Sequence, residues 1–168
     1  MQEELVRALR AQRAETRARW DTLLRIERVN TPLANPDALV FMIDWTLDEV
    51  FNELQHPHAR KRGARAVDGT AARASCPCGR NPLLAYFAAG EQALEETLIL
   101  EQARMTPVDP VQRDASFAEL KTTVRDIARR EIEAFCAVCQ YRNEGRVCSE
   151  PEAAKAPVAE IVKAPATS

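Results

Sequence analysis

Four long stretches of this chain carry apolar residues at spacings of three and four, and their ends are marked by Pro or Gly. The stretches cover residues 3–29, 35–55, 81–105 and 116–141. This spacing places the apolar side chains on one face of an α-helix. Most of the connections between the stretches are short, which is typical of helices that run antiparallel to their neighbours. The sequence therefore predicts an all-α protein, an up-down-up-down four-helix bundle.

Two of these helices begin with the same dipeptide. Asn35-Pro36 and Asn81-Pro82 each combine a favoured N-cap residue with a proline suited to the first turn. The last helix is expected to begin at Asp114 or Ser116. The predicted core positions of the second helix are Val40, Ile43, Leu47, Val50 and Leu54; those of the third are Leu83, Leu84, Phe87, Leu94 and Leu98; those of the fourth are Phe117, Leu120, Val124, Ile127, Ala134, Val138 and Tyr141.

The first two helices carry features beyond a core stripe. Arginines fill the middle of the 3–29 stretch, so we expect a solvated helix that docks mainly at its two ends. In the second helix, Phe41 and Trp45 lie off the core stripe. A second apolar face is typical of the central helix of a bundle or of a helix that also contacts a partner subunit, and these two residues predict self-association or a ligand cleft.

The 168 residues carry 46% hydrophobic and 29% charged residues, which suits one globular domain. We place the helical domain at 1–146 and a disordered Ala-, Pro-, Glu- and Lys-rich tail at 147–168. The N-terminus lacks a signal peptide's apolar segment, and no apolar run approaches the length of a membrane span. These features predict a cytoplasmic protein that does not enter a membrane.

A long loop, residues 56–80, joins the second and third helices. It holds six Lys and Arg residues against one acid, and both histidines of the chain. Such a loop could bind nucleic acid or another anionic surface. No aromatic residue is interleaved with the charges, and the whole chain has a net charge of −2, so we favour a solvated loop over a nucleic-acid site.

Four cysteines form a CxC and a CxxC pair: Cys76 with Cys78, and Cys136 with Cys139. In a reducing compartment such pairs are more often metal-bound or redox-active than structural disulfides. In the predicted bundle, the CxC pair precedes the third helix and the CxxC pair lies near the end of the fourth. Antiparallel neighbours bring these two positions to the same pole, where the end of the second helix is also expected. Cys136 and Cys139 should face away from the main core stripe of their helix, at the flank of the bundle.

Four thiolates are a common ligand set for zinc, and an iron–sulfur cluster is the alternative. His56, His58 and Cys148 are possible substitute ligands. A redox-active disulfide and plain burial of the thiols are the other interpretations of the pattern. The CxC and CxxC pattern is similar to that of redox-regulated zinc chaperones of the heat-shock-33 type. The resemblance covers these four residues alone, and it implies that such a site can act as a switch.

The sequence argues against several enzyme classes. It has no phosphate-binding Gly-rich loop and no nucleophile elbow, and it lacks the Glu-x-x-His pairs of di-iron bundles. We therefore favour a metal-binding (zinc or iron–sulfur) sensor or accessory protein, with a redox response as one form of its action through a protein partner, over an enzyme. The alternatives are a regulatory or ligand-binding helical domain with a purely structural zinc site, and an iron–sulfur component of a redox enzyme.

Overall fold

The computed structural model describes residues 1–26, 36–56, 76, 81–105 and 109–139. Within these ranges every regular element is an α-helix, which confirms the all-α class. The described residues form six helices rather than four, because each of the first two predicted helices is divided. They are α1 (Glu3–Ala11), α2 (Arg13–Ile26), α3 (Pro36–Val40), α4 (Ile43–Gln55), α5 (Pro82–Arg104) and α6 (Pro110–Val138).

Both divisions are tight turns that contain neither Gly nor Pro. At the first, the N–H of Gln12 donates to the carbonyls of both Ala8 (3.2 Å) and Leu9 (3.1 Å), which tightens the last turn of α1. At the second, the N–H of Met42 donates to the carbonyl of Leu39 over 3.0 Å. Each turn lets the following helix leave in a new direction. Neither turn could be predicted from the types of the residues that form it.

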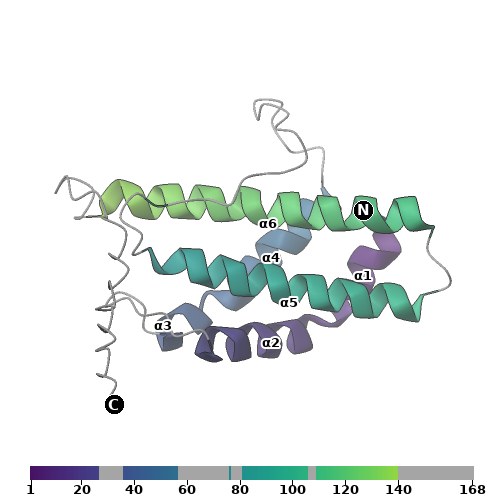
Figure 1. Ribbon diagram of the computed structural model, residues 1–168, viewed down its shortest axis with the longest axis horizontal. Coiled ribbons are helices and arrows are strands. Elements are labelled where there is room, and N and C mark those ends of the chain that lie inside the picture. Colours follow the sequence, from purple (N-terminus) through teal and green to yellow (C-terminus); the bar gives the residue numbers. More distant parts are fainter. Residues whose placement is uncertain (27–35, 57–75, 77–80, 106–108, 140–168) are drawn as a thin grey trace, which may run out of the picture.

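Helix α5 lies between two neighbours that run in the opposite direction, α6 along one side and α2 along the other (Figure 1). Helices α1 and α4 run across these three (Figure 1). The C-terminal end of α4 lies well away from the start of α5 in this view. The expectation that these two ends share a pole is therefore wrong. The start of α5 and the end of α6 do lie at the same end of the molecule.

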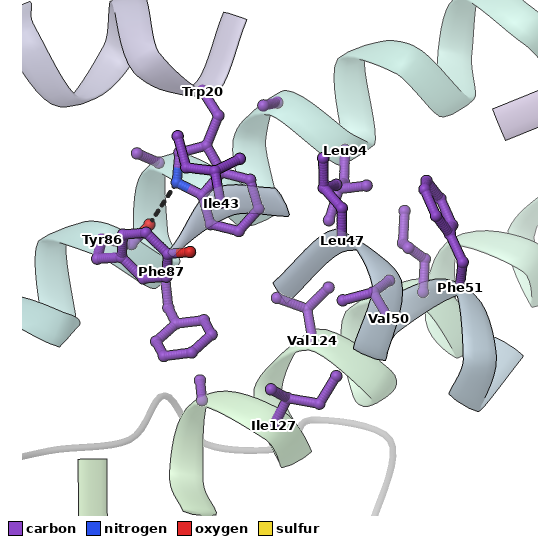
Figure 2. Packing of buried hydrophobic residues seen from close by; sticks show 14 of the residues in the cluster. Trp20, Ile43, Leu47, Val50, Phe51, Tyr86, Phe87, Leu94, Val124 and Ile127 are labelled. Atoms are coloured by element: carbon purple, nitrogen blue, oxygen red, sulfur yellow. Dashed lines mark hydrogen bonds between the residues drawn. The ribbon is translucent and has the colours of Figure 1, made fainter. Parts of the chain in front are cut away.

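Buried side chains from α2, α4, α5 and α6 meet in the core (Figure 2). Trp20 is completely buried, and its indole N–H donates to the carbonyl of Tyr86 over 3.0 Å. The Tyr86 hydroxyl is in turn 2.7 Å from the hydroxyl of Thr46 on α4. Burial raises the pKa of Tyr86 far above its usual value, so the phenol is neutral and one of the two hydroxyls donates to the other.

Gly90 determines how closely α2 approaches α5. A Cβ atom at this position would lie 2.1 Å from Cζ2 of Trp20. The indole ring therefore occupies the space that any larger residue would need.

The predicted core positions of the second helix are all buried. Four of the five predicted core positions in α5 are also buried, and the fifth, Leu84, is half-buried.

The arginines in the first stretch pair with other helices. Arg17 donates to Asp44 over 2.9 Å, and Arg13 bridges Asp44 and Asp48 on α4. The bond from Arg17 lowers the pKa of Asp44, and the bond from Arg13 lowers the pKa of Asp48. Arg19 reaches Glu96 on α5 over 2.6 Å. The expectation of a solvated middle for this stretch is thus only partly right.

Helix α6 begins earlier than predicted. Asp109 is its N-cap, with its carboxylate accepting from the N–H of Gln112 over 3.3 Å, and Pro110 occupies the first turn. This is the arrangement that Asn81 and Pro82 form at the start of α5. Ser116, one of the two predicted caps, is a buried residue inside the helix. An Asp-Pro pair was the better signal, because it supplies both the cap acceptor and the proline.

Candidate thiol site

Two of the four predicted ligands come together where α6 ends. Cys136 lies in the last turns of α6, and Cys76 lies in the segment that precedes α5. Their sulfur atoms are 3.1 Å apart although the residues are separated by 60 positions in the chain. Both side chains are half-buried. The predicted meeting of the CxC and CxxC pairs is therefore realised for one cysteine of each pair.

The position of Cys136 follows from the buried face of α6. Val124, Ala128 and Ile132 are buried and are spaced four residues apart, and Cys136 is the next position in this row. Its side chain packs against the edge of the core cluster. A row in steps of four slants across the helix surface. Cys136 thus continues the core face, and the expectation that it points away from the core is wrong.

The predicted core row of α6 is correct only in its first half. Leu120, Val124 and Ile127 are buried, but Ala134 and Val138 are exposed, Val138 by 79%. The prediction continued an alternating three-four row through Glu131. The buried row moves instead onto Ala128 and Ile132. Tyr141, the last predicted position, lies outside the described residues.

Asn81 connects the thiol pair to the start of α5. Its side-chain oxygen accepts from the N–H of Leu83 over 2.9 Å, as an N-cap does. Its amide nitrogen points to the other helix, 3.5 Å from the carbonyl of Ile132 and 3.7 Å from the sulfur of Cys136. The residue is only 3% exposed. One buried side chain therefore ties the first turn of α5 to the last turns of α6.

The sequence predicted the cap at Asn81 but missed its second role. Ser and Asp are equally good caps, but their side chains offer no amide donor. Asparagine alone among the three carries its acceptor and its donors on two different atoms, so Oδ1 can cap its own helix while Nδ2 reaches a neighbour. The choice of Asn just before a helix, close to a CxC pair, is the signal that could have indicated this link.

The remaining predicted ligands do not join this pair within the described residues. Cys139 follows α6 and is half-buried, with its N–H 3.4 Å from the carbonyl of Cys136. No cluster of three or more His, Cys, Asp or Glu side chains that could hold a metal occurs in the part of the chain described here. Cys78, His58 and Cys148 lie outside it, as does most of the basic 56–80 loop.

His56 is placed away from the thiols. It follows α4 and is exposed, with Nδ1 3.1 Å from the carbonyl oxygen of Asn52. The end of α4 and the end of α6 are well separated in Figure 1. The physical reason is the oblique course of α4, which carries its C-terminus toward the middle of α6 rather than to the pole where α6 ends. His56 is therefore a poor substitute ligand.

The sulfur separation lies between two chemical states. A disulfide has an S–S length of about 2.05 Å. Two thiolates on one tetrahedral zinc ion, each about 2.3 Å from the metal, lie about 3.8 Å apart. The observed 3.1 Å is about 1 Å longer than the first value and about 0.7 Å shorter than the second. Reaching either state would require the two sulfur atoms to move by about 1 Å or less relative to one another.

A second notable surface is apolar. Phe41 is 83% exposed and Trp45 is 50% exposed, at the junction of α3 and α4. This agrees with their predicted position off the core stripe. Phe41 lies in the turn between α3 and α4 and Trp45 in α4, whereas Cys76 precedes α5 and Cys136 lies in α6.

Comparisons with models of protein families, with curated proteins and with solved structures found no match to this chain. Among the helices described here, none combines the length and the apolar character needed to cross a membrane.

Proposed function

We propose that this protein is a metal-binding, non-enzymatic regulatory protein whose metal site includes Cys76 and Cys136. The observation that carries the proposal is the 3.1 Å contact between the two sulfur atoms, from residues 60 positions apart. Cys78 and Cys139 complete the proposed ligand set, because each lies two or three residues from a cysteine of the pair; Cys139, which does not join the pair in this structure, would turn toward it on metal binding. Four thiolates in this arrangement would tie the segment before α5 to the end of α6.

Zinc is the metal that suits this pair best. One tetrahedral zinc ion takes four thiolates, so any two of its ligands lie in the range of a few ångströms that the pair occupies. An iron–sulfur cluster is the alternative. A cubane cluster takes one thiolate on each iron, which sets its cysteine sulfurs farther apart, whereas a two-iron cluster places two thiolates on each iron. Close contact therefore favours zinc or a two-iron cluster.

The proposed role is sensory or accessory. A metal held between two chain segments stabilises their association, and its loss would release the segment before α5 from α6. Another protein could bind one of these two conformations and not the other. A purely structural zinc site is the alternative role, and an iron–sulfur redox component is the second alternative. In the regulatory proposal, Phe41 and Trp45 form the contact surface for a protein partner or a second copy of the chain.

The test is elemental analysis together with an absorption spectrum of protein purified without air. We expect about one zinc per chain, no visible colour, and loss of the metal in Cys136→Ser. A Cys148→Ser variant is the matched control and should keep its metal and lose much less thermal stability than Cys136→Ser. A brown protein would indicate the iron–sulfur alternative. Failure to bind zinc or iron after reconstitution, with all five thiols reactive, would contradict the proposal.

A further inference from the structure

The sulfur contact that supports the proposed metal site also suits a second reaction. Cys76 and Cys136 approach one another from two different parts of the chain, and described residues of α5 and α6 surround the sulfur of Cys136. Cys136 is anchored by the buried row of α6, and Asn81 bonds to it from the start of α5, five residues after Cys76. Their contact of 3.1 Å therefore lies beside the point where Asn81, at the start of α5, bonds to the last turns of α6.

We propose that Cys76 and Cys136 form an intramolecular disulfide by exchange with a small-molecule disulfide, and that this reaction controls the metal site. The inference deepens the proposed function, since the same two sulfurs are proposed there as metal ligands. A sulfur in a disulfide is no longer a thiolate ligand. Oxidation would therefore remove two of four ligands at once and release the metal.

The reaction balances in two exchange steps. One thiolate of the pair attacks a sulfur atom of the small disulfide, the S–S bond of that molecule breaks, and one small thiol leaves. The second protein thiolate then attacks the mixed disulfide at the protein sulfur and expels the other small thiol. The two protein thiols lose two electrons and two protons in total. The small disulfide gains both, and ends as two thiols.

Geometry favours this pair over the two cysteines of the CxxC sequence. Residues three apart on a helix have Cβ atoms about 5–6 Å apart. A disulfide requires Cβ atoms about 3.5–4.5 Å apart. Cys136 lies within α6 and Cys139 directly follows it, so joining them would require the last turn of α6 to change shape. Cys76 and Cys136 already have their sulfur atoms in contact.

The test uses the full-length chain with Cys78, Cys139 and Cys148 changed to Ser, which leaves Cys76 and Cys136. The variant is equilibrated with mixtures of oxidised and reduced glutathione, and the remaining thiols are alkylated and counted by mass spectrometry. The matched control keeps Cys76 and Cys139 and changes Cys78, Cys136 and Cys148 to Ser. We expect the Cys76/Cys136 chain to form its disulfide with an equilibrium constant at least tenfold larger than the control. Equal or weaker oxidation would overturn the inference.

A second measurement on the unmodified chain covers the case in which a triple variant does not fold. The wild-type protein is oxidised by glutathione disulfide, digested and mapped for cross-linked peptides. A predominant Cys76–Cys136 linkage would support the inference. Predominant linkages within the CxC or CxxC sequence would overturn it.

Zinc measurements on the same samples separate this inference from the proposed function. A wild-type chain that binds no zinc but forms the Cys76–Cys136 disulfide would contradict the metal site and support the exchange reaction. A chain that binds zinc but does not form this disulfide would support the metal site and contradict the exchange reaction. If both hold, addition of glutathione disulfide should release zinc in step with disulfide formation.

Discussion

Two junctions join α5 to its neighbours, and they are built in opposite ways. At the Trp20 junction, α2 packs on α5 through a fully buried indole that fills the space above Gly90. At the Asn81 junction, α6 meets the start of α5 through one buried amide and a half-buried sulfur. The first is filled by an apolar ring, and the second is polar and adjacent to a cysteine sulfur. The two junctions share no residue, so a substitution can alter one and leave the other unchanged.

The largest effect on the free energy of unfolding is expected from Gly90→Ala. The added Cβ would overlap Trp20, whose ring is held by its bond to the Tyr86 carbonyl. Overpacking of this kind costs about 1–3 kcal/mol in the free energy of unfolding. Chemical denaturation measures the loss. Ala88→Ser, on the exposed side of the same helix, is the control and should change stability little.

A double variant sharpens this prediction. Trp20→Leu removes the ring that the new Cβ would meet, so Gly90→Ala should be less harmful in that background than in the wild type. Equal effects in both backgrounds would mean that Gly90 and Trp20 are not coupled. The close approach of α2 to α5 would then have another cause.

A smaller effect is expected from Asn81→Ser. Serine keeps the N-cap acceptor for Leu83 but loses the amide that bonds to Ile132 and lies near Cys136. We expect a loss of about 0.5–1.5 kcal/mol in the free energy of unfolding, measured by denaturation of the reduced protein. Asn81→Ala should lose more, because the cap is removed as well.

The Asn81 variant also separates the two junctions. In Asn81→Ser, the reactivity of Cys136 toward an alkylating reagent should rise several-fold, while Trp20 fluorescence should stay as in the wild type. A change in Trp20 fluorescence with no change at Cys136 would contradict the assignment of Asn81 to the thiol end.

The smallest effect on the free energy of unfolding is expected from lowering the pH. Bonds from Arg17 and Arg13 lower the pKa of Asp44 and of Asp48 in the folded protein. A lowered folded pKa contributes stability that is complete above the unfolded value of about 3.9 and is lost as the pH falls through the folded pKa. Both carboxylates are about half exposed, so the contribution is small.

Denaturation at pH 6 and at pH 3 checks this contribution. The wild type should lose more stability between the two conditions than Asp44→Asn does. Asp114→Asn, at an exposed position early in α6, controls for the change in net charge and should behave like the wild type. Equal losses in all three proteins would show that the α2–α4 ion pairs contribute nothing.

Sequence-based prediction of the fold succeeds where a short sequence pattern is compatible with one local structure. The start of α5 at Asn81-Pro82 and the buried stripe from Val40 to Leu54 are of this kind, because caps and spacing are read within one helix. The turn at Gln12 has no such signal, since its residues are all good helix formers. The shift of the buried row of α6 to Ile132 depends on neighbouring helices, which spacing alone does not reveal.

The approach of Cys76 to Cys136 was predicted partly for the wrong reason. The prediction assumed that four antiparallel rods bring three helix ends to one pole. Helix α4 crosses the bundle instead, and its end with His56 lies elsewhere (Figure 1). The antiparallel pair of α5 and α6 is sufficient to bring the two sulfurs together. The contact thus depends on two helices and on Asn81.

The central claim is that Cys76 and Cys136 bind the same metal ion. X-ray absorption at the zinc edge, on protein loaded with zinc without air, tests it most directly. We predict four sulfur ligands at about 2.3 Å, and replacement of one of them by oxygen or nitrogen in each of Cys76→Ser and Cys136→Ser. A first coordination shell without sulfur, or one that neither substitution alters, would contradict the claim.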